Sequence, residues 1–410
     1  MNRVSESMSS LRPSVKGVVI TVFTLLFSHV ALYDLTSVSF FSPMEKAADF
    51  RFSDFYTLVA DKGAVASYEK DIVIVPVDGC DRIRMARAIS DIDFCSPAAV
   101  GLDIFFAPLQ GEGDDPIAEA LSECDNLVMP VMVKADSTGL RTMHLSCYDS
   151  YVEPSGGYAA VNIQGNEDER DCVRDFRCQF ETADGTVKSL AAALAGRGFP
   201  ESYKRLEARP SESETIAYAS REFEVVTPDE ILDNQDLIEG RIVLVGKLQD
   251  RADMHVTPLH NFTPGLMIHA YITATILDGD YTRKLRTWEN ILVAAILCYI
   301  ITWINLHLMK SVMGPIFIRT LQIGLLYFLI LTGTLVYIHF HIDLNFSYSI
   351  LTVSLGVAAC EVYEAVFHED GLIDYITTKL KKRKQTEHEE KSIKPEGMDN
   401  DATSGGGLPG

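Results

Sequence analysis

Four long apolar runs constrain this chain more than any other feature. They occupy residues 17–33, 291–309, 320–340 and 346–360, and none contains a charged side chain. A helix needs about 20 apolar residues to cross the hydrocarbon core of a bilayer. The second and third runs approach that length, and the fourth reaches it when its ends are included. We therefore expect a multi-pass membrane protein embedded in a lipid bilayer.

The first run has two interpretations. Arg3, Arg12 and Lys16 precede it, as in a secretory signal peptide, but residues 31–41 (ALYDLTSVSFF) offer no small-x-small cleavage site. We favour an uncleaved anchor.

Basic residues in the short flanks predict the orientation. Lysines and arginines lie before the first run, between the second and third at Lys310 and Arg319, and after the fourth at residues 379–384 (KLKKRK). All three flanks fall on one side if the runs alternate, and the positive-inside rule makes that side cytoplasmic. One basic flank opposes this assignment, because it lies just before the second run on the outer side: Arg283, Lys284 and Arg286. The predicted segments are a cytoplasmic N-terminus (1–16), spans at 17–33, 290–309, 318–340 and 344–367, an extracytoplasmic domain (34–287) and a disordered cytoplasmic tail (368–410).

Charge and cysteine content suit an outer domain. The chain carries a net charge of −21, and residues 34–287 contain 43 acidic against 24 basic side chains. Such a surface excludes nucleic acid as a partner. Six of the eight cysteines lie in this domain. An oxidising compartment permits disulfides, with Cys172–Cys178 as the first pairing to consider, but the cysteines are equally compatible with a role as small buried apolar residues.

The outer segment alternates strand and helix patterns. Apolar, β-branched runs at 71–78 and 98–106 flank a helical pattern at 82–92, which predicts a right-handed βαβ unit with parallel strands. Near-continuous apolar strands indicate a sheet covered on both faces. We therefore expect an α/β domain with a mostly parallel mixed sheet flanked by helices, plus α-helical spans. Further predicted elements are a helix at 115–123, strands at 126–133, 158–163, 173–180 and 241–246, a helix at 187–194, and a loop or insertion at 196–221.

Acidic residues at the ends of predicted strands mark a candidate site. Asp78 ends the first strand and Asp103 lies in the second apolar run, and ligands of parallel sheets bind beyond the carboxyl edge of the strands. The loop after Gly246 belongs to the same edge. The candidate ligand-binding set is Asp78, Asp103, Asp250, Asp253, Thr257 and His269. The alternative is structural: these carboxylates would cap helices or pair with nearby arginines.

The helix expected after Pro264 leads towards the second span. Pro264 suits a first helical turn, and Thr263 is the predicted cap. His269 lies on this mostly apolar helix, where a neutral histidine bonded within the core is commoner than a metal ligand. With Asp253, His255 and His260 nearby, a divalent cation is a possible cofactor, although the spacing matches no strong zinc or calcium pattern. Histidines near the spans lie at their ends, where polar residues are ordinary, and do not indicate haem.

Four segments resemble the type 2 CHASE family, the cyclase/histidine kinase-associated sensory extracellular domains. They are residues 72–78 (IVIVPVD), 98–106 (AAVGLDIFF), 240–246 (GRIVLVG), and 253–270, where D-x-x-x-T-P precedes P-G-x-x-I-H-A. The similarity covers roughly residues 20–365, including the closing spans. It implies an extracytoplasmic sensory module joined through its spans to an output domain.

The chain departs from this family pattern in two places. The family commonly carries a G-x-W-P-W-x-R stretch after the first strand, whereas residues 79–89 contain neither Trp nor Pro, so no function of that loop is transferred. Residues 368–410 are polar and glycine-rich, with no expected output domain.

Two classes of function follow. The first is a non-enzymatic membrane sensor that binds a small ligand or ion and signals to a separate signalling or membrane partner, as a monomer or homodimer. The second is a membrane-anchored, metal-dependent outer hydrolase; a scaffolding protein with a degenerate sensor is a third possibility. No nucleophile elbow, P-loop, dinucleotide fingerprint or HExxH motif is present, so no catalytic residue is predicted. We expect the protein in a bacterial plasma membrane with the large domain outside.

Overall fold

The computed structural model describes residues 11–33, 54, 57, 67–106, 108–137, 139–163, 172–209, 211–218, 221–259, 262–308, 314–344, 347–367, 372, 375–376, 378–380 and 382. The chain divides into two compact units. The sheet unit comprises Arg51–Leu285 and Thr332–Leu344. The helical unit comprises Met1–Phe50, Arg286–Leu331 and Asn345–Gly410. The predicted disordered tail lies almost wholly outside the described residues.

A seven-stranded sheet forms the centre of the sheet unit. Its strand order is β10-β1-β11-β2-β3-β4, with β5 also paired to β3. Every pairing is parallel except β3 with β4. The predicted mostly parallel mixed sheet is therefore confirmed. The strands are β1 (Ser67–Pro76), β2 (Ala99–Asp103), β3 (Leu127–Asp136), β4 (Gly139–Met143), β5 (Tyr158–Ala160), β10 (Arg221–Val225) and β11 (Ile242–Gly246).

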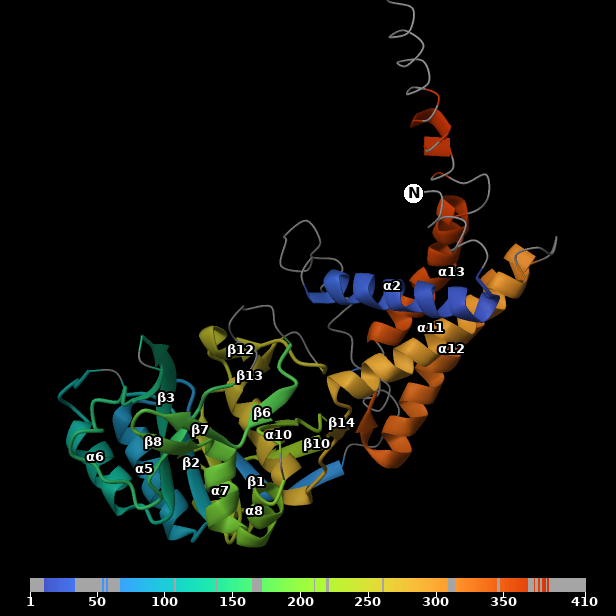
Figure 1. Ribbon diagram of the computed structural model, residues 1–410. Helices are drawn as coiled ribbons and strands as arrows, with labels where there is room; N and C mark the ends of the chain where they lie inside the picture. Colours follow the sequence, from blue (N-terminus) through green and yellow to red (C-terminus); the bar gives the residue numbers. More distant parts are fainter. Residues whose placement is uncertain are drawn as a thin grey trace, which may run out of the picture. The chain divides into compact units, whose positions relative to one another are not determined.

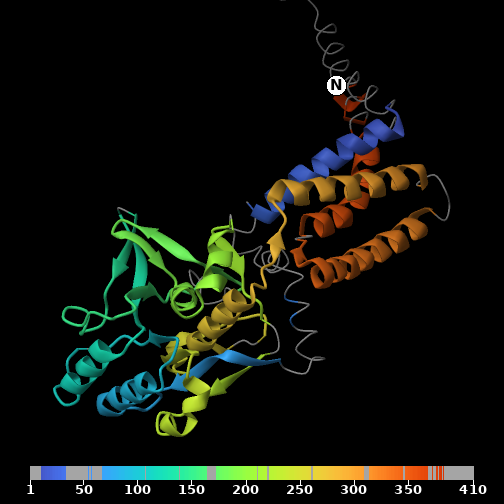
Figure 2. The same cartoon turned by 90° about the horizontal axis from the view of Figure 1, so that it is seen from below.

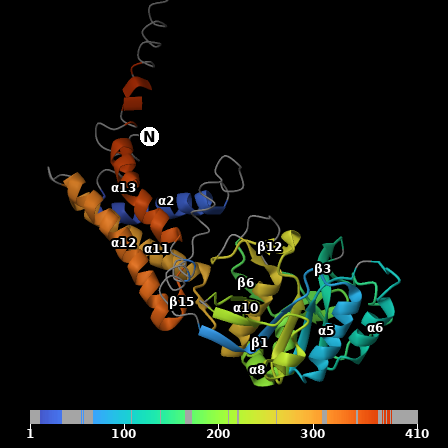
Figure 3. The same ribbon diagram turned by 180° about the vertical axis from the view of Figure 1, so that it is seen from behind.

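Helices cover both faces of the sheet. One core contains Ile72, Ile74 and Leu244 with the apolar sides of α7, α8 and α10. The other contains Val73 and Val75 with α5 and α6. Figure 1 shows α7 in front of the sheet. Figure 3, which is the view from behind, shows α5 in front of the opposite face. The central stretches of these strands, residues 72–75, 99–102 and 242–245, are apolar at every position because neither face meets water there. These helices are α5 (Arg82–Phe94), α6 (Asp114–Glu123), α7 (Leu190–Gly198), α8 (Pro200–Glu207) and α10 (Gly265–Asp278).

Short elements complete the sheet unit. They are β6 (Asp175–Arg177) paired with β9 (Ser213–Thr215), β7 (Gln179–Thr182) with β8 (Gly185–Lys188), β12 (Met254–His255) with β13 (Thr263–Pro264), β14 (Arg283–Lys284) with β15 (Ile342–Asp343), η2 (Leu232–Asn234), α9 (Gln235–Ile238) and η3 (Arg251–Asp253).

Three sequence predictions between residues 173 and 221 were wrong. The single strand at 173–180 is two strands, β6 and β7, which pair with different partners on either side of Cys178. The helix expected at 187–194 begins at Leu190, because Gly185–Lys188 forms a hairpin strand. The expected loop at 196–221 contains α8 and β9. Each of these segments is too short for a periodic pattern to identify it.

The expected cysteine pairing is also wrong. None of the eight cysteines, Cys172 and Cys178 included, forms a disulfide in the described part of the chain. Cys178 lies against the core of α7, α8 and α10, and burial raises its thiol pKa to about 11. It therefore has the character of a small apolar residue.

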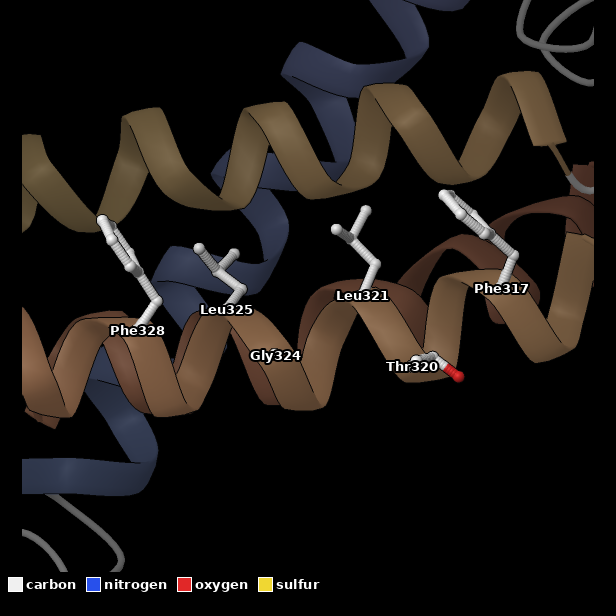
Figure 4. A pocket seen from close by; sticks show the side chains of 6 residues that line it. All are labelled: Phe317, Thr320, Leu321, Gly324, Leu325 and Phe328. Carbon is white, nitrogen blue, oxygen red and sulfur yellow. The ribbon is translucent and has the colours of Figure 1, made fainter.

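In the described part of the chain, four helices are long and apolar enough to cross a membrane. They are α2 (Pro13–Tyr33), α11 (Thr287–Leu308), α12 (Gly314–Phe340) and α13 (Ser347–Phe367). Figure 2 shows them together, and Ile20, Leu306 and Cys360 join α2, α11 and α13 in one apolar cluster. An apolar pocket of about 470 Å³ runs along α12 between Phe317 and Phe328, whose side chains point towards the neighbouring helix in Figure 4.

Polar contacts fix which helix ends lie together within the helical unit. At one end, Lys16 Nζ is 3.1 Å from Glu364 Oε1. Arg319 contacts Glu361 Oε1 at 3.1 Å. At the other, His29 Nδ1 lies 2.8 Å from the Tyr348 hydroxyl. The starts of α2 and α12 therefore share an end with the close of α13.

Candidate functional site

The carboxyl ends of the three central strands lie side by side. Pro76 of β1 pairs with Gly246 of β11, which pairs with Asp103 of β2. Because parallel strands end at the same edge, the loops after β1 and β11 and the side chain of Asp103 meet there. The six candidate residues all lie at or near this edge.

Asp78 joins two of these loops. Its Oδ2 accepts a hydrogen bond from the backbone N–H of Leu248, and its Oδ1 from that of Gln249, both at 2.9 Å. The carboxylate thus holds the loop after β11 against the loop after β1. This geometry assigns Asp78 a structural contact at the site.

Asp250 and Thr257 also have local partners. Asp250 caps η3 by accepting from the Ala252 N–H at 3.0 Å. Thr257 and Thr263 bring their hydroxyl oxygens to 2.9 Å, next to the β12–β13 pairing. Both contacts stabilise the loop that places Asp253 next to the start of α10.

The start of α10 differs from its prediction. Thr263 does not cap the helix, because its hydroxyl is bonded to Thr257. Pro264 occupies the cap position, and no side chain caps the helix there. Pro264 supplies a fixed φ without an N–H that needs a partner.

Asp253 lies against the first turn of α10. A Cβ on Gly265 would lie only 2.6 Å from Asp253 Oδ1, so a side chain here would push the half-exposed carboxylate away from the helix. The same oxygen is 3.1 Å from His255 Nε2. A carboxylate here is favoured by the positive end of the helix dipole. Pro264 and Gly265 therefore leave space for the Asp253 carboxylate at the start of α10.

Asp103 and His269 form the buried part of the site. His269 Nε2 is 4.0 Å from Asp103 Oδ2, and the histidine side chain is only 2 % exposed. Among the described residues, neither ring nitrogen has a partner at hydrogen-bond distance and angle, although the Val161 backbone lies close. A buried polar ring without a partner is unusual and costs stability. His269 therefore retains the capacity to bond an added group.

Burial changes the protonation of both groups. Desolvation, with a smaller contribution from the Asp253 charge, raises the pKa of Asp103 to about 7. Desolvation lowers the pKa of His269 to about 4, against an opposing effect of Asp253. Near neutral pH the imidazole is thus uncharged and Asp103 is near its midpoint.

The donors do not assemble into a metal centre. Among the described residues, no group of three histidine, cysteine or acidic side chains is placed to hold a metal ion. His260, considered earlier as a donor, lies outside the described residues. What the edge offers is a pair of carboxyl groups, Asp103 and Asp253, with His269 as an unpartnered hydrogen-bonding group.

The far end of α10 is tightly bound within the sheet unit. Arg205 and Ser202 both bond the Leu277 carbonyl, at 2.7 and 3.1 Å. Arg221 pairs with Asp278 and Glu69. Beyond the helix, β14 pairs with β15, which follows α12. The segment between α10 and α11 is therefore held by the loop between α12 and α13.

Sequence analysis missed the cationic residues Lys188 and Arg197, which line a separate polar cleft. They come from a hairpin strand and a helix that were not correctly delimited, so no pattern placed them together.

The chain matches the CHASE2 domain over residues 25–307, well over half of its length. The chain belongs to the CHASE2 family. CHASE2 domains are extracytoplasmic sensory modules, and the resemblance noted from the sequence is confirmed. Together with the four apolar helices, this identifies a membrane sensory protein of signal transduction. Comparison with curated proteins and with solved structures finds no match.

Proposed function

We propose that this CHASE2 protein is a multi-pass receptor that binds a small ligand or ion at the strand edge and passes the signal through α10 to its spans. The observation that carries the proposal is His269: a buried ring without a hydrogen-bond partner, 4.0 Å from Asp103. A ligand that bonds this ring would remove the cost of burying it without a partner. A cation that neutralises Asp103 and Asp253 would remove the cost of holding the buried charge of Asp103 beside a second carboxylate. The site thus favours an occupant.

The same residues tie binding to α10. Asp253 touches Gly265 at the helix's first turn, and His269 lies one turn further along. α10 ends at Asp278, and α11 begins at Thr287. A change in the charge or position of Asp253 would alter the helix that leads by the shortest chain path into a span. Because the site contacts the helix that leads into a span, we propose a sensor and not merely a binding protein.

We place the sheet unit outside the plasma membrane of a bacterial cell and the basic ends of the helices in the cytoplasm. Lys16 and Arg319 lie at the end of the helical unit that also holds Glu361 and Glu364, as an alternating path requires. The contrary charge at Lys284 is neutralised by Asp175 at 2.6 Å, which weakens it as an orientation signal.

The output belongs, in this proposal, to a separate signalling or membrane protein, with homodimer formation as one way of engaging it. We propose a receptor and not an enzyme, because the CHASE2 family is sensory.

The proposal can be tested on full-length protein in lipid nanodiscs. Divalent cations (Mg²⁺, Ca²⁺, Mn²⁺ and Zn²⁺) and small amines would be screened by the shift of the thermal midpoint. A compound that acts at the strand edge should stabilise the wild type and Asp71→Asn, a control acid exposed on β1, but not Asp103→Asn or His269→Gln.

Transmission would be measured by hydrogen exchange. An active compound should change protection across residues 265–285 in the wild type and not in Asp103→Asn. Equal stabilisation of all variants, or binding without any change in that segment, would refute the proposed route.

A further inference from the structure

A second polar cavity lies away from the strand-edge site. It has a volume of about 780 Å³ and is walled by β3, β4, the start of β5, the β7–β8 hairpin and α7. None of its lining residues belongs to the candidate site. The isolated bridge between Ala160 and Ser189 brings the end of β8 and the start of α7 against β5.

Three glycines, Gly156, Gly157 and Gly196, line the cleft. A Cβ on Gly156 would overlap the Leu127 backbone carbonyl carbon at 2.6 Å, and Gly157 has a φ of +77°. Side chains at these two positions would be strained or would clash.

Two cations at the cleft are held by neutral groups. Lys188 Nζ lies 4.1 Å from the ring centroid of Tyr203. Arg197 donates from Nε to Asn126 Oδ1 at 3.0 Å and from Nη2 to the Ser155 carbonyl at 2.7 Å. Within the described part of the chain, neither cation has a carboxylate partner.

This lack of pairing is informative because the domain is so acidic. With 43 acidic against 24 basic side chains between residues 34 and 287, most cations have carboxylates available. Contacts with a ring face and with carbonyl oxygens orient the two groups but leave their charge uncompensated. An anion at this cleft would therefore meet two fixed positive charges.

The remaining polar groups restrict the anion. Asp184 Oδ2 accepts from the Thr142 N–H at 3.2 Å, so one carboxylate stands at the same cleft. His144 packs edge-on against Tyr158, with ring centroids 4.6 Å apart. A compact ligand with one or two acidic groups fits this set better than a polyanion, because the Asp184 carboxylate would repel further negative charge.

We propose that the cleft binds a small organic anion, whose carboxylate or phosphate group is held by Lys188 and Arg197. This site is independent of the strand-edge site, so either can fail without the other.

Calorimetric titration of the full-length protein in nanodiscs tests the proposal. Succinate probes a carboxylate ligand and inorganic phosphate a phosphate ligand, each at constant ionic strength set with chloride. At least one probe should bind, and the probe that binds more tightly assigns the acidic group. Lys188→Gln should weaken that binding about tenfold, because it removes a charged donor.

Three controls make the result specific. Lys134→Gln removes an exposed lysine on β3 outside the cleft and should bind as the wild type does. Arg197→Lys keeps the charge and should retain most of the affinity, while Asp103→Asn should not change it. Absence of binding by both probes at millimolar concentration would overturn the proposal. So would equal affinity of the Lys188→Gln and Lys134→Gln variants.

Discussion

At the scale of single residues, the Asp103–His269 pair has opposite effects on stability as pH changes. The raised pKa of Asp103, about 7, means that the folded state holds a proton that the unfolded state releases above about pH 4. The lowered pKa of His269, about 4, means that the folded state lacks a proton that the unfolded state binds below about pH 6.5. Between about pH 4 and 6.5 the Asp103 contribution to the free energy of unfolding falls with pH while the His269 contribution rises. The two contributions therefore nearly cancel in this range.

Replacing Asp103 with Asn should expose the histidine's contribution. In Asp103→Asn, the free energy of unfolding should rise by roughly 2 kcal/mol between about pH 4.5 and 7, since only His269 then titrates. The wild type should stay nearly flat and then lose stability as pH rises through 7. Thermal midpoints over this pH range would measure the difference. The double variant with His269→Gln should again be flat; a slope that survives in it would contradict the assignment to this pair.

Gly265 permits a second test at this scale. Gly265→Ala should destabilise the sheet unit by about 1–3 kcal/mol, because its Cβ would clash with the Asp253 carboxylate. Thermal unfolding would measure the loss. Gly324→Ala is a matched control, since its Cβ would meet nothing within 4 Å. Adding Asp253→Ala should restore much of the stability of Gly265→Ala, and no recovery would show that the clash lies elsewhere.

At the scale of elements, sequence pattern succeeded where a strand or helix was long and uniformly apolar. The central strands and the helices α5 and α6 appear close to their predicted places, and the acids of Asp103 and Asp253 meet at the expected edge. It failed between residues 173 and 221, where strands of three or four residues alternate with short helices. The bonds from Asp78 to Leu248 and Gln249 were equally beyond prediction, because they depend on loop conformation.

The C-terminal end of α10 depends on one arginine. Arg221 is 8 % exposed and bonds both Glu69, also 8 % exposed, and Asp278. Arg221→Met should cost about 3–5 kcal/mol, because it leaves the Glu69 carboxylate buried without its partner. Arg84→Met is the matched control: its pairing with Asp229 is exposed and contributes less than about 1 kcal/mol.

Hydrogen exchange would distinguish a local from a general effect in this pair of variants. Arg221→Met should lose protection first in residues 275–285, where the helix joins the segment before α11. Loss of equal size in both variants would mean that burial of the ion pair is unimportant.

At the scale of the whole molecule, the chain joins an acidic sheet unit to four apolar helices. Different polar groups meet at the two ends of the helical unit. Lys16 and Arg319 meet Glu361 and Glu364 at one end of the helical unit, and His29 meets Tyr348 at the other. These four long apolar helices were predictable because their apolar length alone identifies them. Their mutual packing was not, since it depends on which side chains meet inside the unit.

Epitope insertion would test the orientation that this arrangement of helix ends supports. A tag in the exposed β7–β8 turn, between Asp184 and Gly185, should bind antibody in bacterial spheroplasts without permeabilisation. A tag following Lys382 should bind only after detergent treatment, because the basic flanks remain on the cytoplasmic side. A thermal midpoint within a few degrees of the untagged protein would establish that each tagged protein is folded. If both tags were accessible before permeabilisation, the helices could not alternate as proposed, and the route from α10 through the spans to a cytoplasmic partner would fail with them.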